Sequence, residues 1–331
     1  MNNYWAFAEM TASNDLLGDR EALRARLDDE GYLYFRGLIP RERVLALRGE
    51  ILEVLGDHGW IAGGDKLDNA EVVGMPVREG DEEYFSAYDD VQRLESFHSL
   101  AHDDGLVGAV RGALGETAFP HPLKVARLVF PSEPEVSTPP HQDFLNNQGS
   151  PDLTAAWIPL GDCPMKQGTL AILRGSQRYG VLPLEFSLGP GNRQAVVPNE
   201  MRDRLTWVTN DFSAGDVLLF PAMTVHASLH NATGRMRVSV DFRYQREGEP
   251  ATDLVLNPHF GRLSWEEIYA GWKSDELKYY WRDLDFPVVP YDRTPFQSSE
   301  PDVDKIQEVI IYEHWRKLRH EGKAPGRGRP D

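Results

Sequence analysis

The sequence is poor in cysteine and has no long apolar run. Cys163 is the only cysteine among 331 residues, which excludes an intrachain disulfide and any metal site built from several thiolates. A metal ion would have to be bound by histidine and carboxylate side chains. No stretch of about 18 uncharged apolar residues is present to span a bilayer, and the first residues lack the features of an export signal. We therefore expect a cytoplasmic protein that does not enter a membrane.

Basic residues are also scarce relative to acidic ones. Lys and Arg number 35 against 52 Asp and Glu, and the formal net charge is −17. A nucleic acid would require clustered positive charge, so we expect no nucleic-acid partner and favour a small-molecule substrate. Hydrophobic residues make up 41% of the chain, which is enough for a substantial core. Nothing in this composition selects an oligomeric state.

The N-terminal segment begins with helical and strand patterns. Leucines spaced over residues 15–29 predict an amphipathic helix, and residues 31–38 predict a short strand. Pro40 suits the first turn of a further helix, and an apolar stripe follows it.

A long connector follows this second helix. Residues 56–90 are rich in Gly and acidic side chains, and connectors of this length are often lids over a binding site. Tyr84 and Phe85 are candidate lid residues. A helix is predicted for residues 91–114.

Short apolar runs predict β-structure in the middle of the chain. The runs are separated by Gly, Pro, Asn and Asp, which is typical of a sandwich or barrel. They cover residues 123–130, 153–160, 169–173, 217–220 and 238–244. The chain is therefore expected to be mostly β with flanking helices.

The C-terminal part again predicts helices. Ser264 and Glu267 form the pattern of a capping box at the start of one helix. A second helix is expected over residues 303–320, and residues 322–331 form an expected disordered tail.

Two histidines have an aspartate two residues later. His102 and Asp104 lie in a stretch with helical periodicity, where residues two apart point about 200° apart, so we expect a solvent-exposed helix face. His141 and Asp143 follow Pro140 in strand-like surroundings, where such residues share one face. This second pair supplies two of the three ligands of a 2-His-1-carboxylate iron site.

The third ligand is expected from another strand. His226 follows residues 215–221, which have the pattern of a turn, a buried strand and a stop. His230 lies further along the same face and is the alternative ligand.

Polar and apolar residues alternate over residues 235–243. One face of this strand carries Arg235, Arg237, Ser239, Asp241 and Arg243. Interior arginines need a counter-charge, which either Asp241 and Asp216 or a bound anion would provide. A dicarboxylate is the natural anion, because a guanidinium binds a carboxylate through two parallel hydrogen bonds.

Three segments in this order resemble the phytanoyl-CoA dioxygenase family, a branch of the iron(II)- and 2-oxoglutarate-dependent oxygenases. They are GYLYFRGLIP from residue 31, HQDFLNNQGSPDLTAAWIPLGDCPMKQGTLAILRGSQ from residue 141, and GDVLLFPAMTVHASLHNATGRMRVSVDFRYQ from residue 215. Residues 174–177 read Arg-Gly-Ser-Gln where the family usually has Pro-Gly-Ser-His, which affects a loop rather than the metal ligands. Asp143 is typical of hydroxylases, since halogenating relatives carry a small residue there.

The resemblance implies a double-stranded β-helix, the jelly-roll or cupin-like core. It predicts a single catalytic domain over residues 1–321. Its parts would be N-terminal helices and a lid in residues 1–122, the jelly roll in residues 123–245, and C-terminal helices in residues 246–321.

The resemblance also assigns roles. His141, Asp143 and His226 are the implied iron(II) ligands and catalytic residues. Arg237 is implied to bind the far carboxylate of 2-oxoglutarate, assisted by Ser228, with Arg235 as the alternative. Iron(II), with 2-oxoglutarate and O2 as co-substrates, would hydroxylate a small molecule and release succinate and CO2.

Further contacts are expected near the motifs. Phe144, Asn146 and Trp157 are candidates to line the substrate pocket, and Lys124 and Arg127 are candidates to contact the co-substrate or an acidic substrate. One rival hypothesis is a cupin-like metalloenzyme that does not use 2-oxoglutarate, which would need the iron ligands but no buried arginine. The other is a non-catalytic binding protein, a kind that typically loses ligands.

Overall fold

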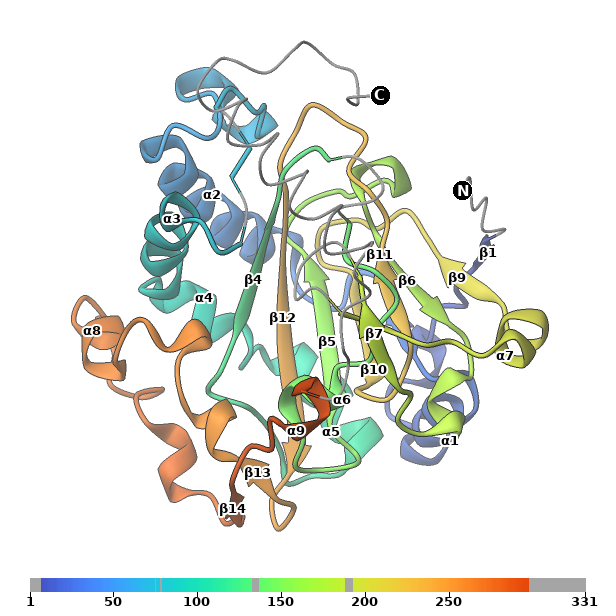
Figure 1. The fold of residues 1–331 in the computed structure, drawn as a ribbon. Coiled ribbons are helices and arrows are strands. Elements are labelled where there is room, and N and C mark those ends of the chain that lie inside the picture. The colour runs from blue at the N-terminus through green and yellow to red at the C-terminus, as the bar shows by residue number, and fades with distance from the viewer. Residues whose placement is uncertain (1–6, 75, 78, 133–136, 188–192, 298–331) are drawn as a thin grey trace.

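Two β-sheets pack against each other in the computed structural model of this chain, with helices around them (Figure 1). The structure describes residues 7–297 except residues 75, 78, 133–136 and 188–192. The helix predicted for residues 303–320 and the tail from residue 322 lie outside the described residues. No helix in the described part of the chain is long and apolar enough to cross a membrane.

The larger sheet combines strands from distant parts of the chain. Its order is β2–β10–β5–β12–β3, β4 also pairs with β12, and these pairs are antiparallel. The strands are β2 (Leu33–Phe35), β3 (Ala118–Pro120), β4 (Val125–Val129), β5 (Thr154–Pro159), β10 (Val217–Pro221) and β12 (Arg237–Arg246).

The smaller sheet has the order β1–β9–β6–β11, in which only β1 and β9 run parallel. Its strands are β1 (Phe7–Glu9), β6 (Leu170–Leu173), β9 (Trp207–Thr209) and β11 (His226–Ser228). Two short pairs complete the described strands: β7 (Leu184–Phe186) with β8 (Arg193–Ala195), and β13 (Ala251–Thr252) with β14 (Val288–Val289).

Strand alternation gives the larger sheet two different faces. Val240 and Phe242 of β12 pack with Ile158 of β5 in the core beneath the helices. Trp157 of β5 packs instead with Ile172 of the smaller sheet. Because successive strand residues point to opposite faces, the odd-numbered residues of β12 face the space between the two sheets.

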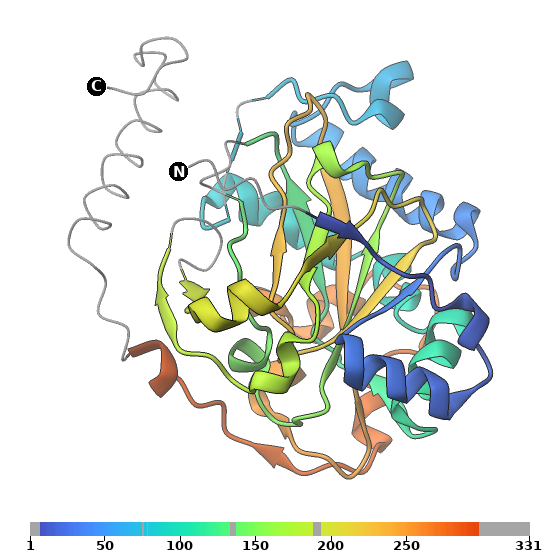
Figure 2. The same cartoon turned by 90° about the vertical axis from the view of Figure 1, so that its right-hand side faces the viewer.

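Five helices pack around the core of the larger sheet. They are α1 (Arg20–Glu30), α2 (Arg41–Asp57), α3 (Glu82–Gln92), α4 (Glu95–Leu100) and α5 (Asp104–Leu114). Helices α2, α3 and α4 lie together on the left of Figure 1. Figure 2 shows α1, in blue, beside α5, in teal. The sequence explains the limits of α1. The Asp19 carboxylate accepts a hydrogen bond from the Ala22 N–H, and Gly31 adopts a left-handed φ of 75° that favours glycine.

The turn between α4 and α5 corrects one prediction. The helix expected over residues 91–114 is interrupted here, and His102 is half-buried in the turn. Asp103 is buried and caps α5 by accepting hydrogen bonds from the N–H groups of Gly105 and Leu106. The predicted solvent-exposed helix face is therefore wrong for His102, whereas Asp104 is exposed at the start of α5. Helical periodicity did not reveal the cap inside an apparently continuous pattern.

Residues 56–90 contain more regular structure than the predicted lid. A 3-10 helix covers Gly64–Asn69, and α3 begins within the segment. Tyr84 is buried, with its ring stacked on Trp60 at 6.0 Å and on Tyr88 at 5.8 Å. A lid role for Tyr84 is therefore wrong, because its ring belongs to the core under the helices.

Short helices connect the remaining segments. They are α6 (Phe144–Asn147), α7 (Asn199–Arg204), α8 (Trp265–Tyr269) and α9 (Thr294–Gln297), together with 3-10 helices at Asn14–Leu16, Met165–Gln167, Ser176–Tyr179, Asp253–Leu256, His259–Gly261 and Tyr280–Asp283. The predicted capping box is confirmed at α8, where Ser264 and Glu267 exchange side chain to backbone hydrogen bonds.

Candidate metal centre

Two histidines from distant parts of the chain meet at the edge of the smaller sheet. His226 is the first residue of β11, and His141 pairs with it in an antiparallel bridge. The His141 N–H donates to the His226 carbonyl at 2.9 Å, and the His226 N–H donates to the His141 carbonyl at 3.0 Å. The backbone therefore fixes the two imidazoles side by side, with ring centroids 4.1 Å apart.

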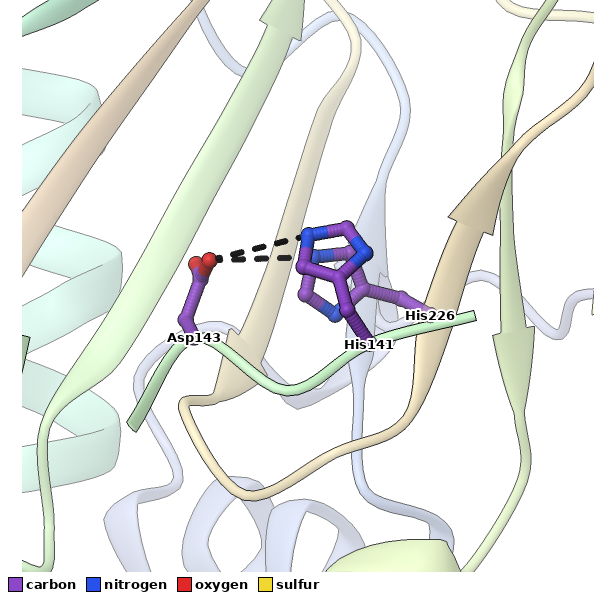
Figure 3. A group of neighbouring side chains, drawn as sticks. All are labelled: His141, Asp143 and His226. Carbon is purple, nitrogen blue, oxygen red and sulfur yellow. Dashed lines mark ion pairs between the residues drawn. The ribbon is translucent and has the colours of Figure 1, made fainter. Parts of the chain in front are cut away.

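Asp143 completes a group of three converging side chains, here named the metal-ligand group (Figure 3). The Nε2 atoms of His141 and His226 each lie 3.9 Å from Oδ1 of Asp143. Bonds from nitrogen or oxygen ligands to a first-row metal are about 2 Å long, so an ion between these atoms can contact all three. No other group of three possible ligands was found among the described residues.

Backbone carbonyls fix the orientation of both rings. Nδ1 of His141 donates to the Pro139 carbonyl at 2.8 Å, and Nδ1 of His226 donates to the Thr224 carbonyl at 3.0 Å. A neutral imidazole that donates from Nδ1 presents the lone pair of Nε2. Both rings are therefore in the tautomer that a metal ion requires, and their Nε2 atoms face Asp143.

The electrostatics favour the metal-binding protonation states. Burial lowers the pKa of His141 to about 3, and burial also lowers the pKa of His226, so both rings are neutral. Burial on its own raises the pKa of Asp143. Nearby Arg243 and the two imidazoles have a larger opposite effect, so the pKa lies well below its ordinary value. Two neutral imidazoles and an ionised carboxylate fit a divalent cation, because all three atoms offer lone pairs.

Arg237 is a buried cation in the same interior. Its Nη2 donates to the Ser228 hydroxyl at 3.2 Å, and its Nη1 donates to the Ser239 hydroxyl at 3.1 Å. Its Nε has no hydrogen-bond partner, and no carboxylate within the described ranges lies at ion-pair distance. Ser228 is two residues from His226 on β11, so this guanidinium lies on the same face of the strand as the metal-ligand group.

The other interior arginines do have acidic partners. Arg127 Nε lies 2.8 Å from Asp241, and Arg243 Nη2 lies 2.8 Å from Asp143. Asp216, the other predicted partner, instead accepts hydrogen bonds from the Tyr34 hydroxyl and from backbone N–H groups. Protein carboxylates therefore neutralise Arg127 and Arg243, whereas Arg237 has no acidic partner among the described residues.

Several predicted residues lie away from this interior. Arg235 is exposed, in contrast to Arg237, and His230 lies beyond the end of β11. Lys124 donates to the His121 carbonyl and to the Tyr280 hydroxyl, on the opposite face of the larger sheet from Arg127. Asn146 is exposed at the surface of α6.

Two predicted pocket residues lie closer to the candidate site. Trp157 is buried, donates from Nε1 to Ser239 at 3.1 Å, and has its ring 5.9 Å from the Arg237 guanidinium. Phe144 is half-buried directly after Asp143.

The sequence analysis missed Phe220, whose ring lies 4.5 Å from His226, and the roles of Ser239 and Arg243. Strand alternation placed Ser239 and Arg243 on the same face as Arg237, but it did not identify their hydrogen-bond partners.

The metal-ligand group alone indicates a class of protein. An interior between two sheets that brings two imidazoles and one carboxylate together has the ligand set of a mononuclear non-haem iron enzyme. Residues 27–239 match the phytanoyl-CoA dioxygenase (PhyH) family. The chain therefore belongs to this family of iron(II)- and 2-oxoglutarate-dependent oxygenases, and the predicted family is confirmed.

Individual proteins support the same assignment. The chain is 30% identical to the 1-deoxypentalenic acid 11-beta-hydroxylase of Streptomyces arenae over 72% of its own length and 86% of the relative. It is 29% identical to the enzyme of the same name from Streptomyces exfoliatus, over 70% and 82% of the two chains.

Among solved structures, the epimerase SnoN in complex with Fe3+, alpha ketoglutarate and nogalamycin RO is similar, with a TM-score of 0.50 and 21% identity over 70% of this chain and 85% of that one. The predicted jelly-roll fold is confirmed, although the sheets do not close into a barrel.

Proposed function

We propose that this chain is an iron(II)- and 2-oxoglutarate-dependent dioxygenase that hydroxylates an unactivated C–H bond of a small organic molecule and releases succinate and CO2. One observation carries the proposal. The metal-ligand group and a buried arginine, Arg237, face the same interior, and Arg237 has no acidic partner in the described part of the chain. The cytoplasmic location expected from the sequence belongs to the same proposal.

His141, Asp143 and His226 would hold iron(II), which supplies oxygen activation coupled to the oxidative decarboxylation of 2-oxoglutarate. Three protein ligands of this kind leave other coordination positions free for co-substrates. Arg237 binds the far carboxylate of the diacid through its guanidinium, and the Ser228 hydroxyl stands beside it. Trp157 and Phe220 surround these groups with apolar surface, which excludes water and strengthens the charged contacts.

The substrate proposed for this chain is a small organic molecule. The two Streptomyces relatives are named for hydroxylation of 1-deoxypentalenic acid, and SnoN is named as an epimerase. Hydroxylation is favoured here because the relatives with the higher sequence identity are hydroxylases. Phe144 and Arg127 remain candidate substrate contacts, because Phe144 directly follows Asp143 and Arg127 pairs with Asp241 on the interior face of β12. Asn146 is not retained, because it is exposed on α6.

The test uses protein freed of metal and handled without oxygen. Iron(II) and 2-oxoglutarate are added in turn while binding is measured, and oxygen and a panel of small organic acids follow, with succinate and oxidised product quantified. We expect one iron per chain and succinate release that a substrate stimulates. Substrate turnover without 2-oxoglutarate would instead support the cupin-like alternative, and a chain that binds no iron would contradict the proposed enzyme.

A further inference from the structure

Charged side chains follow one another along the interior face of β12. Arg243 Nη2 lies 2.8 Å from Asp143 Oδ2 and 4.0 Å from Asp241 Oδ2, and Asp241 is bound in turn by Arg127 at 2.8 Å. The side chains of Arg243 and Asp143 are only 5% and 4% exposed. This ion pair therefore lies in the interior, where each charge depends on its partner.

The ion pair gives the two oxygens of the Asp143 carboxylate different partners. Oδ1 faces the Nε2 atoms of both histidines at 3.9 Å, and Oδ2 accepts the hydrogen bond from Arg243. We propose that Arg243 is a positioning residue for the metal centre, because its guanidinium occupies Oδ2 and leaves only Oδ1 of Asp143 for the ion. This inference rests on the proposed function, since it assumes that the metal-ligand group binds an ion.

The neighbouring charges hold Arg243 in this role. Asp241 is the other acid near Arg243, but its carboxylate already accepts a hydrogen bond from Nε of Arg127. Arg243 therefore makes its hydrogen bond to Asp143. Without Arg243 the Asp143 carboxylate would lose its charged donor and could rotate. Both of its oxygens could then face the ion, and the second oxygen would compete with co-substrates for a coordination position.

The experiment compares variants of one strand. Metal-free wild type, R243Q, R243M and R243K are titrated with Co(II) under anaerobic conditions, and the visible d–d absorption reports the coordination of the ion. R246Q is the matched control, because Arg246 also lies on β12 and pairs with acids, Asp152 and Glu249, away from the metal-ligand group. Thermal unfolding of each metal-free protein shows which variants are folded.

We expect R243Q and R243M to bind Co(II) roughly 10- to 100-fold more weakly with an altered spectrum. R243K should recover part of the affinity, and R246Q should match the wild type. Wild-type affinity and spectrum in a folded R243Q or R243M would overturn the proposal. Failure of all three Arg243 variants to fold would also overturn it, by making Arg243 a structural residue. A wild type that binds no Co(II) would contradict the proposed function itself.

Discussion

Two groups of largely buried basic side chains lie on opposite faces of the larger sheet and differ in their counter-charges. The metal-ligand group lies between the sheets, where the Asp143 carboxylate faces both imidazoles and Arg243 neutralises it. The second group is here named the outer basic cluster. It lies beneath aromatic side chains of the C-terminal segment and consists of His98, His102 and Lys124.

Burial shifts the outer basic cluster towards its uncharged forms. Burial lowers the pKa of Lys124 to about 7, and burial lowers the pKa values of His98 and His102 to about 3. In the described part of the molecule Lys124 donates only to the His121 carbonyl and the Tyr280 hydroxyl, not to a carboxylate.

This comparison shows that buried histidines are not sufficient for a metal site. His98 donates from Nε2 to the Gln92 carbonyl. His141 and His226 instead donate from Nδ1 to backbone carbonyls, which leaves the Nε2 lone pair available to a metal ion. The difference lies in which nitrogen the backbone binds and in the presence of a carboxylate. The outer basic cluster therefore packs against the C-terminal segment, whereas the metal-ligand group has the geometry to bind a metal ion.

The prediction with the largest expected effect replaces one histidine in each group by alanine. H226A should lower the affinity for iron(II) by more than about 100-fold, since it removes a direct ligand, whereas loss of a residue behind a ligand costs about 10- to 100-fold. H102A should retain wild-type affinity, because His102 lies on the other side of the sheet. Anaerobic metal titration of both proteins provides the measurement. Equal loss in the two variants would remove the distinction between the groups.

The next effect concerns the two neighbouring arginines. R237A should raise the KM for 2-oxoglutarate by about 10- to 100-fold, because a charge-assisted hydrogen bond contributes about 1.5–3 kcal/mol. R235A serves as the matched control and should change little, since Arg235 is exposed. Succinate release at varied 2-oxoglutarate concentration measures both. A KM unaffected by R237A would favour an enzyme that does not use 2-oxoglutarate.

Local patterns in the sequence were enough to predict the His141–Asp143 pair and the polar strand face that carries Arg237, whereas the choice of His226 over His230 came from the family resemblance. His141 and Asp143 stand two apart after prolines that exclude a helix, and the alternation around Arg237 indicates a strand with one polar face. Both signals depend on neighbours within a few residues. Such predictions hold in the folded structure, because strand geometry determines which residues share a face.

Contacts between distant segments could not be predicted in this way. Arg243 and Asp143 are 100 residues apart in the chain, and nothing local distinguishes this pair from the Asp216 partner that the sequence also allowed. Strand alternation already places Lys124 and Arg127 on opposite faces, but which of the two faces the interior depends on how β4 pairs with β12. The cap formed by Asp103 was missed for a different reason, since the helical pattern continues on both sides of it.

A smaller effect separates stability from chemistry at Lys124. Its pKa falls from 10.5 in the unfolded chain to about 7 in the folded one, so between these values the unfolded state binds more protons and stability rises with pH. K124M removes this dependence. From about pH 7 to about pH 9, the wild type should gain on the order of 2 kcal/mol in unfolding free energy relative to K124M. Urea denaturation of both proteins at the two pH values measures the gain.

Two further outcomes decide what K124M means. Metal affinity should be unchanged in this variant, because Lys124 faces away from the metal-ligand group. Parallel pH profiles for wild type and K124M would show instead that Lys124 keeps its proton in the folded protein.

The smallest effect lies at the edge of the outer region. S264A removes the capping box of α8, in which the Ser264 hydroxyl accepts from the Glu267 N–H at 3.2 Å. Thermal or urea unfolding should show a loss of about 1 kcal/mol, the usual cost of losing an N-cap side chain. Co(II) affinity of the folded variant should equal that of the wild type, because α8 packs through Trp265 and Tyr269 over the outer basic cluster. A weaker affinity in S264A would mean that the two faces of the sheet are energetically coupled, and the separation drawn between them would fail.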